Sequence, residues 1–280
     1  MEQWLLAHEA TLRLGMFFGV FMAMAGWEWR TPCRTLRLTR WRRWSNNLAL
    51  VLLNSLLLRL LFPAAAVGVA AWAQIHGWGL LNHVELPLWL ALLLSVTALD
   101  LLIYWQHRLF HQLPWLWRLH RVHHADLDYD LTTGLRFHPL EILLSMLIKS
   151  AAILLLGPPL LAVLLFELIL NGMAMFNHGN VQLPPALDNG LRRLLVTPDM
   201  HRVHHSIHLN EMHRNFGFNL SIWDRLFGSY AAQPKDGHRG MQIGLPDEPD
   251  PRRVDRLDGM LLLPFHAPTE QSRAGGPGVD

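Results

Sequence analysis

The sequence has very little cysteine and little charge for its length. Cys33 is the only cysteine in 280 residues, which excludes an internal disulfide, an iron–sulfur cluster held by this chain and a cysteine-based zinc site. Charged residues make up 16% and hydrophobic residues 51%, an apolar balance for a soluble protein of this size. The formal net charge of +2 is small, so the placement of the basic residues is more informative than their sum.

Positive charge is also missing from the start of the chain, where a cleaved targeting segment carries it. Glu2 and Glu9 occupy that region instead. We therefore expect the apolar run that follows to be a retained membrane anchor.

Four apolar stretches approach or exceed the roughly 20 residues that a membrane-spanning helix needs. They cover residues 12–29, 48–72, 88–105 and 140–176. Pro63 interrupts the second and predicts a kink or a helical hairpin, and Gly157-Pro158-Pro159 divides the last into a hairpin that either crosses and returns or is re-entrant. The expected fold class is an all-α integral membrane bundle of about three spans plus a helical hairpin, with a cytosolic His-rich helical cap.

The basic residues are distributed unevenly between the loops. Residues 30–43 contain six arginines and no acid, whereas residues 74–86 contain no Lys or Arg. Between two apolar spans such a run indicates the cytoplasmic side rather than a nucleic-acid-binding face, so we expect no nucleic-acid partner. This asymmetry predicts a multi-pass protein with its N-terminus outside and its histidine motifs on the cytoplasmic side.

Histidines recur in three motifs at helical spacing. His107 and His111 form HxxxH, and the same word, His-Arg-Val-His-His, occupies both 120–124 and 201–205. Positions three and four apart share a face of a helix, so each motif directs its imidazoles together. Eight imidazoles are too many for one tetrahedral zinc and suit two metal ions. On ligand type, copper, zinc and iron all stay open.

The order of these motifs resembles the fatty acid hydroxylase/sterol desaturase superfamily, whose members are integral-membrane, non-haem di-iron oxygenases. The resemblance covers roughly residues 99–230 and extends beyond the histidines. It includes Asp100 with Tyr104-Trp105-Gln106-His107-Arg108, Arg136-Phe137-His138-Pro139-Leu140-Glu141, Asn177-His178-Gly179-Asn180, Asn215-Phe216-Gly217 and Trp223-Asp224-Arg225-Leu226-Phe227-Gly228-Ser229. Phe216 and Ser229 stand where the family pattern has Tyr and Thr, which are conservative departures.

The resemblance implies two iron ions, dioxygen as co-substrate and a lipid substrate within the bilayer. The metal ligands that it implies are His107, His111, His120, His123, His124, His201, His204 and His205, with His178 as a ninth and His138 as a possible further ligand. Hydroxylation, desaturation and methyl oxidation all occur in the superfamily, so the reaction stays open. No flavin, nicotinamide or Cys-ligated motif is visible, and we therefore expect a separate electron-donor protein. The oligomeric state is not predicted.

Metal-bound histidines usually donate their second N–H to a carboxylate or carbonyl, which orients the ring. Asp100 is the strongest candidate for that role, because with Tyr104, His107 and His111 it forms one helical stripe and it lies in an apolar span. The other carboxylates considered are Glu141, Asp199 and Asp224. The remaining histidines that follow the third motif, His208 and His213, are expected to lie in a loop outside the site.

The motifs divide the chain into three expected regions. These are an N-terminal transmembrane region (1–94), a fatty acid hydroxylase-like catalytic domain (95–230) and a C-terminal tail (231–280) with a disordered end. A short apolar patch at 261–265 is expected either on the membrane surface or packed on the catalytic domain.

Two other classes of protein compete with the oxygenase. A zinc hydrolase would use metal-bound water, but the chain has no HExxH and no acid within the histidine motifs. A metal transporter or sensor would place its ligands within the bilayer core, whereas these motifs follow the apolar spans.

Overall fold

The regular secondary structure is helical throughout the described residues, 2–248 and 250–266 of the computed structural model. In chain order the elements are α1 (Glu2–Ala7), α2 (Glu9–Arg30), α3 (Arg40–Leu61), α4 (Ala65–Ile75), η1 (Leu80–His83), α5 (Leu88–Gln112), α6 (Pro114–His124), η2 (Thr133–Leu135), α7 (Pro139–Leu156), α8 (Leu160–Asn177), α9 (Pro185–Leu191), α10 (Pro198–His204), α11 (Leu209–Met212), α12 (Ile222–Leu226), α13 (Gly237–Gly240), α14 (Pro251–Val254), α15 (Leu257–Leu262) and η3 (Leu263–Phe265). Apart from two isolated β-bridges, these residues form no β-structure, which confirms the all-α prediction.

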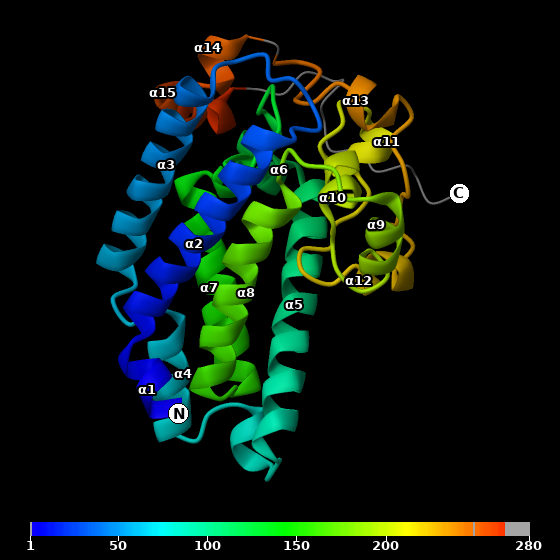
Figure 1. The fold of residues 1–280 in the computed structure, drawn as a ribbon. Helices are drawn as coiled ribbons and strands as arrows, with labels where there is room; N and C mark the ends of the chain where they lie inside the picture. Colours follow the sequence, from blue (N-terminus) through cyan, green and yellow to red (C-terminus); the bar gives the residue numbers. More distant parts are fainter. Residues whose placement is uncertain (1, 249, 267–280) are drawn as a thin grey trace.

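The long helices form one bundle. The short helices α9 to α15 gather at one end and along one side of it (Figure 1). Helix α8 is the centre of the bundle and packs against α2, α4 and α5. Five helical segments are long and apolar enough to cross a membrane, namely α2, the stretch from Arg40 to His83, α5, α7 and α8. The chain is therefore a multi-pass helical membrane protein, the class expected from the sequence.

Pro63 produces a kink and not a hairpin. Helix α3 ends at Leu61 and α4 begins at Ala65, and Figure 1 shows both running away from the end that carries the short helices. Ala66 and Ala70 of α4 pack in a buried cluster with Ile153 of α7 and Val163 of α8.

The hairpin of α7 and α8 turns at Gly157. This residue adopts φ +65°, a left-handed conformation that glycine reaches without strain. Each of its two helices has 18 residues, which at 1.5 Å per residue is about 27 Å and is close to the ~30 Å of a bilayer core. This length favours crossing and returning over a shallow re-entrant hairpin.

Three charged side chains on the long helices are paired with one another. The carboxylate of Glu167 on α8 binds Lys149 of α7, and it also accepts a 2.5 Å hydrogen bond from Arg13 of α2. An ionisable group within a membrane span is costly unless it is paired, so these residues pin three helices together. Glu167 and Arg13 escaped the sequence analysis because their partners are distant in the chain.

A second polar cluster joins the bundle to the loop after α6. Arg43 of α3 donates to Asp126 at 2.7 Å and also binds Asp130, while Glu28 of α2 accepts from the backbone N–H of Leu131 at 2.7 Å and of Asn180 at 2.8 Å. Burial by itself would raise the pKa of Asp126, but the Arg43 guanidinium lowers it below its ordinary value. Helices α2 and α3 are thereby fastened to the segments that flank the histidines.

The C-terminal segments cover α6. Val254, Met260 and Leu263 share a buried cluster with Trp117 and Val122 of α6. The apolar patch at 261–265 therefore packs on the predicted catalytic domain, as one of its two expected placements. The predicted disordered end of the chain lies outside the described residues.

Candidate metal centre

Nine buried histidines form two neighbouring groups. The first group contains His107, His111, His120, His124 and His204, and the second contains His123, His178, His201 and His205. Within each group the potential ligand nitrogens all lie within 4.8 Å of one another. The three histidine motifs and His178, which are far apart in the sequence, thus converge on one place, and each group could hold one metal ion.

The two identical His-Arg-Val-His-His motifs, at 120–124 and 201–205, contribute to the groups in opposite ways. The first word supplies its positions one and five, His120 and His124, to the first group and His123 to the second. The second word supplies His201 and His205 to the second group and His204 to the first. In each motif the first and fifth residues thus belong to one group, and the fourth residue belongs to the other group.

The imidazoles approach one another through their Nε2 atoms. His204 and His107 are 2.9 Å apart at these atoms. In the second group, His178 Nε2 lies 3.1 Å from the Nε2 of His123, 3.0 Å from that of His201 and 3.2 Å from that of His205. His178 is therefore the hub of the second group.

Backbone carbonyls orient three of these rings through the other ring nitrogen, Nδ1. The Nδ1 of His107 lies 2.8 Å from the Phe216 carbonyl oxygen, that of His204 lies 2.7 Å from Arg214, and that of His178 lies 2.7 Å from Ala174. A ring that donates its Nδ1–H to a carbonyl keeps a lone pair on Nε2, which is the form that binds a metal. Sequence analysis could not identify these partners, because every residue has a carbonyl.

Glu141 is the carboxylate that orients a histidine of the site. Its Oε1 lies 2.7 Å from Nδ1 of His120, and both side chains are buried. Pro139 starts α7 two residues earlier, so the first turn of that helix carries the acid toward α6. Among the four candidate carboxylates this is the direct contact.

Asp100 lies elsewhere, contrary to the expectation that it orients a histidine. Its Oδ2 accepts hydrogen bonds from Trp223 Nε1 at 2.8 Å and from the backbone N–H of Leu220 at 3.2 Å. The helical stripe with His107 does exist on α5, but seven residues are about 10 Å along a helix. Asp100 is therefore too far down α5 to reach the ring and instead holds the segment before α12.

Asp224 acts on the site through the backbone. It accepts from the N–H groups of Phe216 at 2.7 Å and Gly217 at 2.8 Å, and the Phe216 carbonyl in turn meets His107. Burial raises the pKa of Asp224 to about 6 against these hydrogen bonds, which lower it. Asp199 pairs with Arg202 at 2.6 Å.

Three other candidate histidines lie outside both groups. His138, considered as a possible ligand, caps α7 by accepting from the Leu140 N–H at 3.2 Å, and its Nε2 faces the Leu261 carbonyl. Its place at a helix start turns it away from the centre. His208 pairs with Asp236 at 2.8 Å near the surface, and His213 packs with its ring centroid 5.4 Å from that of His111.

Each group also packs against a buried aromatic ring that sequence analysis missed. The Trp117 ring centroid lies 4.9 Å from that of His111, and the Tyr129 centroid lies 5.2 Å from that of His205. The Tyr129 hydroxyl donates to the Asn177 carbonyl at 2.8 Å. Nothing in their spacing marks these residues, because the fold alone brings them to the site.

The donor atoms fit a pair of metal ions. Both ring nitrogens of His111 and of His124 are buried without a hydrogen-bond partner, as is Nε2 of His120, and buried polar atoms are normally satisfied. Burial lowers the pKa of His120 and of His178 to about 3. These rings are therefore neutral at physiological pH, and neutral imidazole is the form that zinc, copper, iron and nickel bind.

A multi-pass helical membrane protein with a buried, all-histidine centre for metal is the class that the fold and the site define. Residues 92–229 match the family model described as fatty acid hydroxylase, and this range contains all nine histidines. The chain thus contains a fatty acid hydroxylase domain, which confirms the predicted resemblance to the fatty acid hydroxylase/sterol desaturase superfamily.

Among curated proteins, the chain is similar to alkylglycerol monooxygenase of Danio rerio, with 33% identity over 172 residues, 58% of this chain and 35% of the relative. It is also similar to the human alkylglycerol monooxygenase, with 32% identity over 144 residues, 50% of this chain and 30% of the relative. Ornithine lipid hydroxylase OlsE of Rhizobium tropici shares 32% identity over 178 residues, 62% of this chain and 51% of the relative. The matches thus span about a third to a half of these relatives. No solved structure matches the chain.

Proposed function

We propose that this protein is a membrane-bound di-iron oxygenase that hydroxylates a lipid. The observation that carries the proposal is the convergence of nine buried, neutral imidazoles in two adjacent groups. Such a donor set, without cysteine, suits a pair of borderline metal ions. The relatives reported above are named as an alkylglycerol monooxygenase and an ornithine lipid hydroxylase, which favours hydroxylation over desaturation.

Each group is proposed to hold one iron ion. His107, His111, His120, His124 and His204 would bind the first, and His123, His178, His201 and His205 the second. When bound, the iron pair supplies the activation of dioxygen. The catalytic region is proposed to be residues 95–230, between the N-terminal transmembrane region and the C-terminal tail.

In the overall reaction a lipid C–H bond, dioxygen, two electrons and two protons give a C–OH group and water. The two electrons come from a separate one-electron carrier protein. The chain's own residues hold the site together: Glu141 orients His120, and carbonyls orient His107, His178 and His204. The spans would keep a long apolar substrate in the bilayer with its reactive carbon at the histidine end, which the arginine asymmetry predicts to be cytoplasmic.

The experiment compares membrane lipids and bound iron in cells expressing the natural chain, His204→Ala and His208→Ala. His208 is the matched control, because it lies four residues further on and pairs with Asp236 at the surface. We expect a lipid heavier by about 16 mass units, one added oxygen, with the natural chain and the control only, and a lower iron content in His204→Ala. Equal product from His204→Ala, or turnover without oxygen and reductant, would contradict the proposal.

A further inference from the structure

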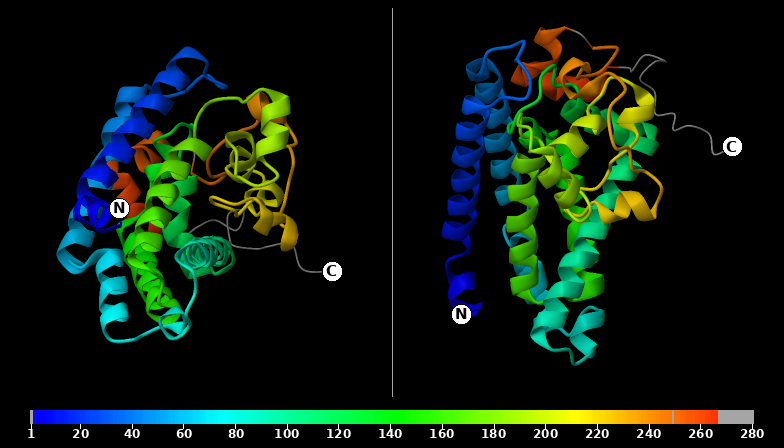
Figure 2. Two further views of the ribbon diagram at one scale, coloured as in Figure 1. Left: turned by 60° about the horizontal axis from the view of Figure 1, so that its bottom comes forward. Right: turned by 45° about the vertical axis from the view of Figure 1, so that its right-hand side comes forward.

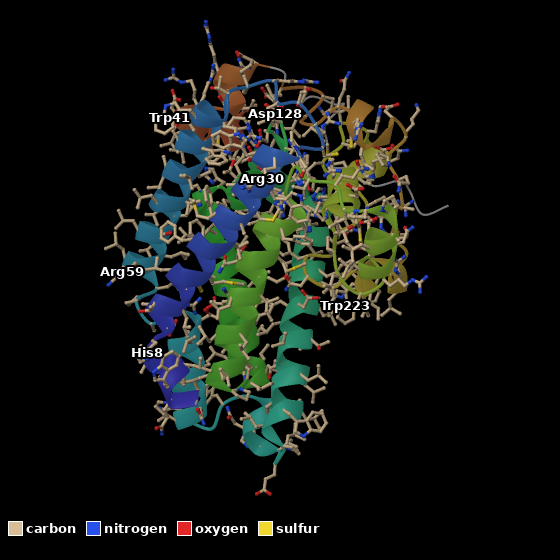
Figure 3. All side chains as sticks on the ribbon, in the orientation of Figure 1. His8, Arg30, Trp41, Arg59, Asp128 and Trp223 are labelled. Atoms are coloured by element: carbon tan, nitrogen blue, oxygen red, sulfur yellow. The ribbon has the colours of Figure 1, made fainter. Side chains whose placement is uncertain are left out.

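Helix α12 lies against the middle of a membrane-spanning helix. Trp223 of α12 donates its indole N–H to Asp100, which is the thirteenth of the 25 residues of α5. Phe227, just after α12, stacks on Tyr104 with ring centroids 5.4 Å apart. Figures 1 and 3 show α12 and Trp223 beside α5, well below its upper end, and Figure 2 shows the lobe of α9 to α13 at the side of the bundle.

The register between α5 and α7 sets the depth of this contact. Gln106 of α5 donates to Ser145 of α7 at 2.9 Å, so these residues lie at one level. Ser145 is six residues below the start of α7 at Pro139, and Asp100 is six residues below Gln106. Twelve residues at 1.5 Å place Asp100 about 18 Å below the start of α7. Because α7 is itself only about 27 Å long, α12 lies at the level of the hydrocarbon.

One edge of this lobe is apolar. Leu194 and Leu226 are each 65% exposed and Ile222 is 44% exposed, and the Ser221 N–H donates to the Leu194 carbonyl at 2.9 Å, so the three lie close together. The exposed Trp105 on α5 continues the apolar surface, since Phe227 packs on it with centroids 4.8 Å apart.

Two exposed arginines border this apolar surface. Arg193 precedes Leu194, and Arg225 lies over the Tyr230 ring at 3.8 Å. Long arginine side chains can place apolar stems along hydrocarbon and their charge among lipid phosphates.

We infer that the edge of the lobe formed by Leu194, Ile222 and Leu226 is embedded in the hydrocarbon of the bilayer. The lipid acyl chains cover it as a continuation of the lipid-facing surface of α5. The protein thus contacts the bilayer hydrocarbon through this edge as well as through its spanning helices. This inference does not depend on the proposed oxygenase activity.

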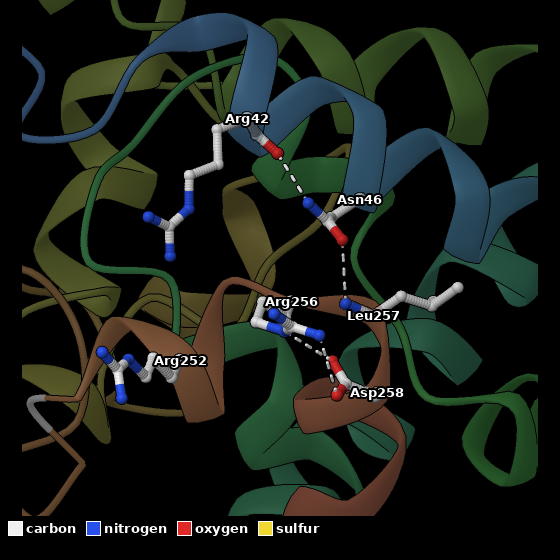
Figure 4. Close-up of a pocket in the computed structure, with 6 residues that line it drawn as sticks. All are labelled: Arg42, Asn46, Arg252, Arg256, Leu257 and Asp258. Carbon is white, nitrogen blue, oxygen red and sulfur yellow. Dashed lines mark hydrogen bonds and ion pairs between the residues drawn. The ribbon is translucent and has the colours of Figure 1, made fainter.

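The test places a small fluorophore on single cysteines of the full-length chain in a Cys33→Ala background, reconstituted in phosphatidylcholine vesicles. Leu226→Cys is the test position. Asp258→Cys is the aqueous control, because its side chain is 66% exposed beside the pocket over α15, paired with Arg256 (Figure 4). Leu155→Cys, at a residue 77% exposed on α7, is the bilayer control. A melting temperature equal to that of the unlabelled chain shows that each variant is folded.

Lipids with brominated acyl chains should quench the label at 226 about as strongly as at 155 and several-fold more than at 258. Aqueous iodide should quench in the opposite order. Quenching of the 226 label by iodide as at 258, and not by the brominated lipid, would overturn the inference. Protection of this label from both quenchers would overturn it too, since a second copy of the chain would then cover the surface.

Discussion

The two His-Arg-Val-His-His words are identical in sequence but differ in their surroundings. The first ends α6, a helix of 11 residues, and the second lies in α10, a helix of seven residues capped by the Thr197 side chain. Glu141 orients His120 of the first word, whereas a backbone carbonyl orients His204 of the second. The arginines differ as well, since Arg121 pairs with Asp247 and Arg202 with Asp199.

Each of the two motifs contributes histidines to both groups, so the two groups depend on the same two helices. Each word gives two histidines to one group and the third to the other, so neither group is complete without both helices. The first group has five members and the second four. A pair of metal sites built this way forms only when α6 and α10 are both docked, which makes the centre a product of tertiary packing.

The largest effect is expected from removing, in each motif, the one histidine that belongs to the other group. In the described structure His123 belongs to the second group and His204 to the first. Both His123→Ala and His204→Ala should abolish product, because each removes an imidazole from a buried site that no water replaces equally. Metal analysis should show iron lost in both variants, with different spectra of the iron that remains. Identical residual spectra would mean that the two words do not serve separate ions.

Glu141→Gln should lower the iron affinity of the first group, to which His120 belongs, and leave that of the second group unchanged. The amide is a weaker acceptor for the His120 ring than the carboxylate, and changing such a partner typically costs about 10–100-fold in metal affinity or activity. Titration with iron should show this loss in one of two binding phases. Asp236→Asn is the matched control, because its carboxylate pairs with His208 at the surface. Weakening of both phases by Glu141→Gln would show that Glu141 supports more than the first group.

Asp224→Ala should act on the first group indirectly. It leaves the buried N–H groups of Phe216 and Gly217 without their acceptor, and an unsatisfied buried donor costs about 1–3 kcal/mol. A lower melting temperature and weaker iron binding by the first phase are expected. Unchanged stability would mean that the turn at Phe216 holds the His107 ring without this carboxylate.

His138→Ala should have the smallest effect. In the structure this residue caps α7, and loss of a helix cap costs about 1 kcal/mol. Iron content should equal that of the natural chain while the melting temperature falls slightly. Loss of an iron ion from the His138→Ala variant would instead show that His138 is a metal ligand.

Sequence patterns predicted the membrane-spanning segments and the helical histidine motifs of this protein. The periodic apolar runs identified the spans, and Pro63 marked a real kink between α3 and α4. The histidine spacing placed His120 and His124 on one helical face, where they are found together. These features could be predicted because they depend on neighbours in the chain.

Contacts between distant segments escaped prediction. Asp100 has the right helical phase to serve His107, but the position of α12 gives it to Trp223. Glu167 pairs with Arg13 across 154 residues, and no local pattern links them. The region boundaries at 94 and 230 and the cytoplasmic side of the histidines stay predictions.

By itself, the amino-acid sequence determined that this chain is helical and membrane-spanning and that its imidazoles point inward from three motifs. Those properties follow from hydrophobic length and from 3.6-residue periodicity, which are local. Only the tertiary structure decided which histidines share a group, which carboxylate or carbonyl orients each ring, and how deep α12 lies against α5. Such choices depend on how helices dock, because identical words acquire different partners when different segments pack around them.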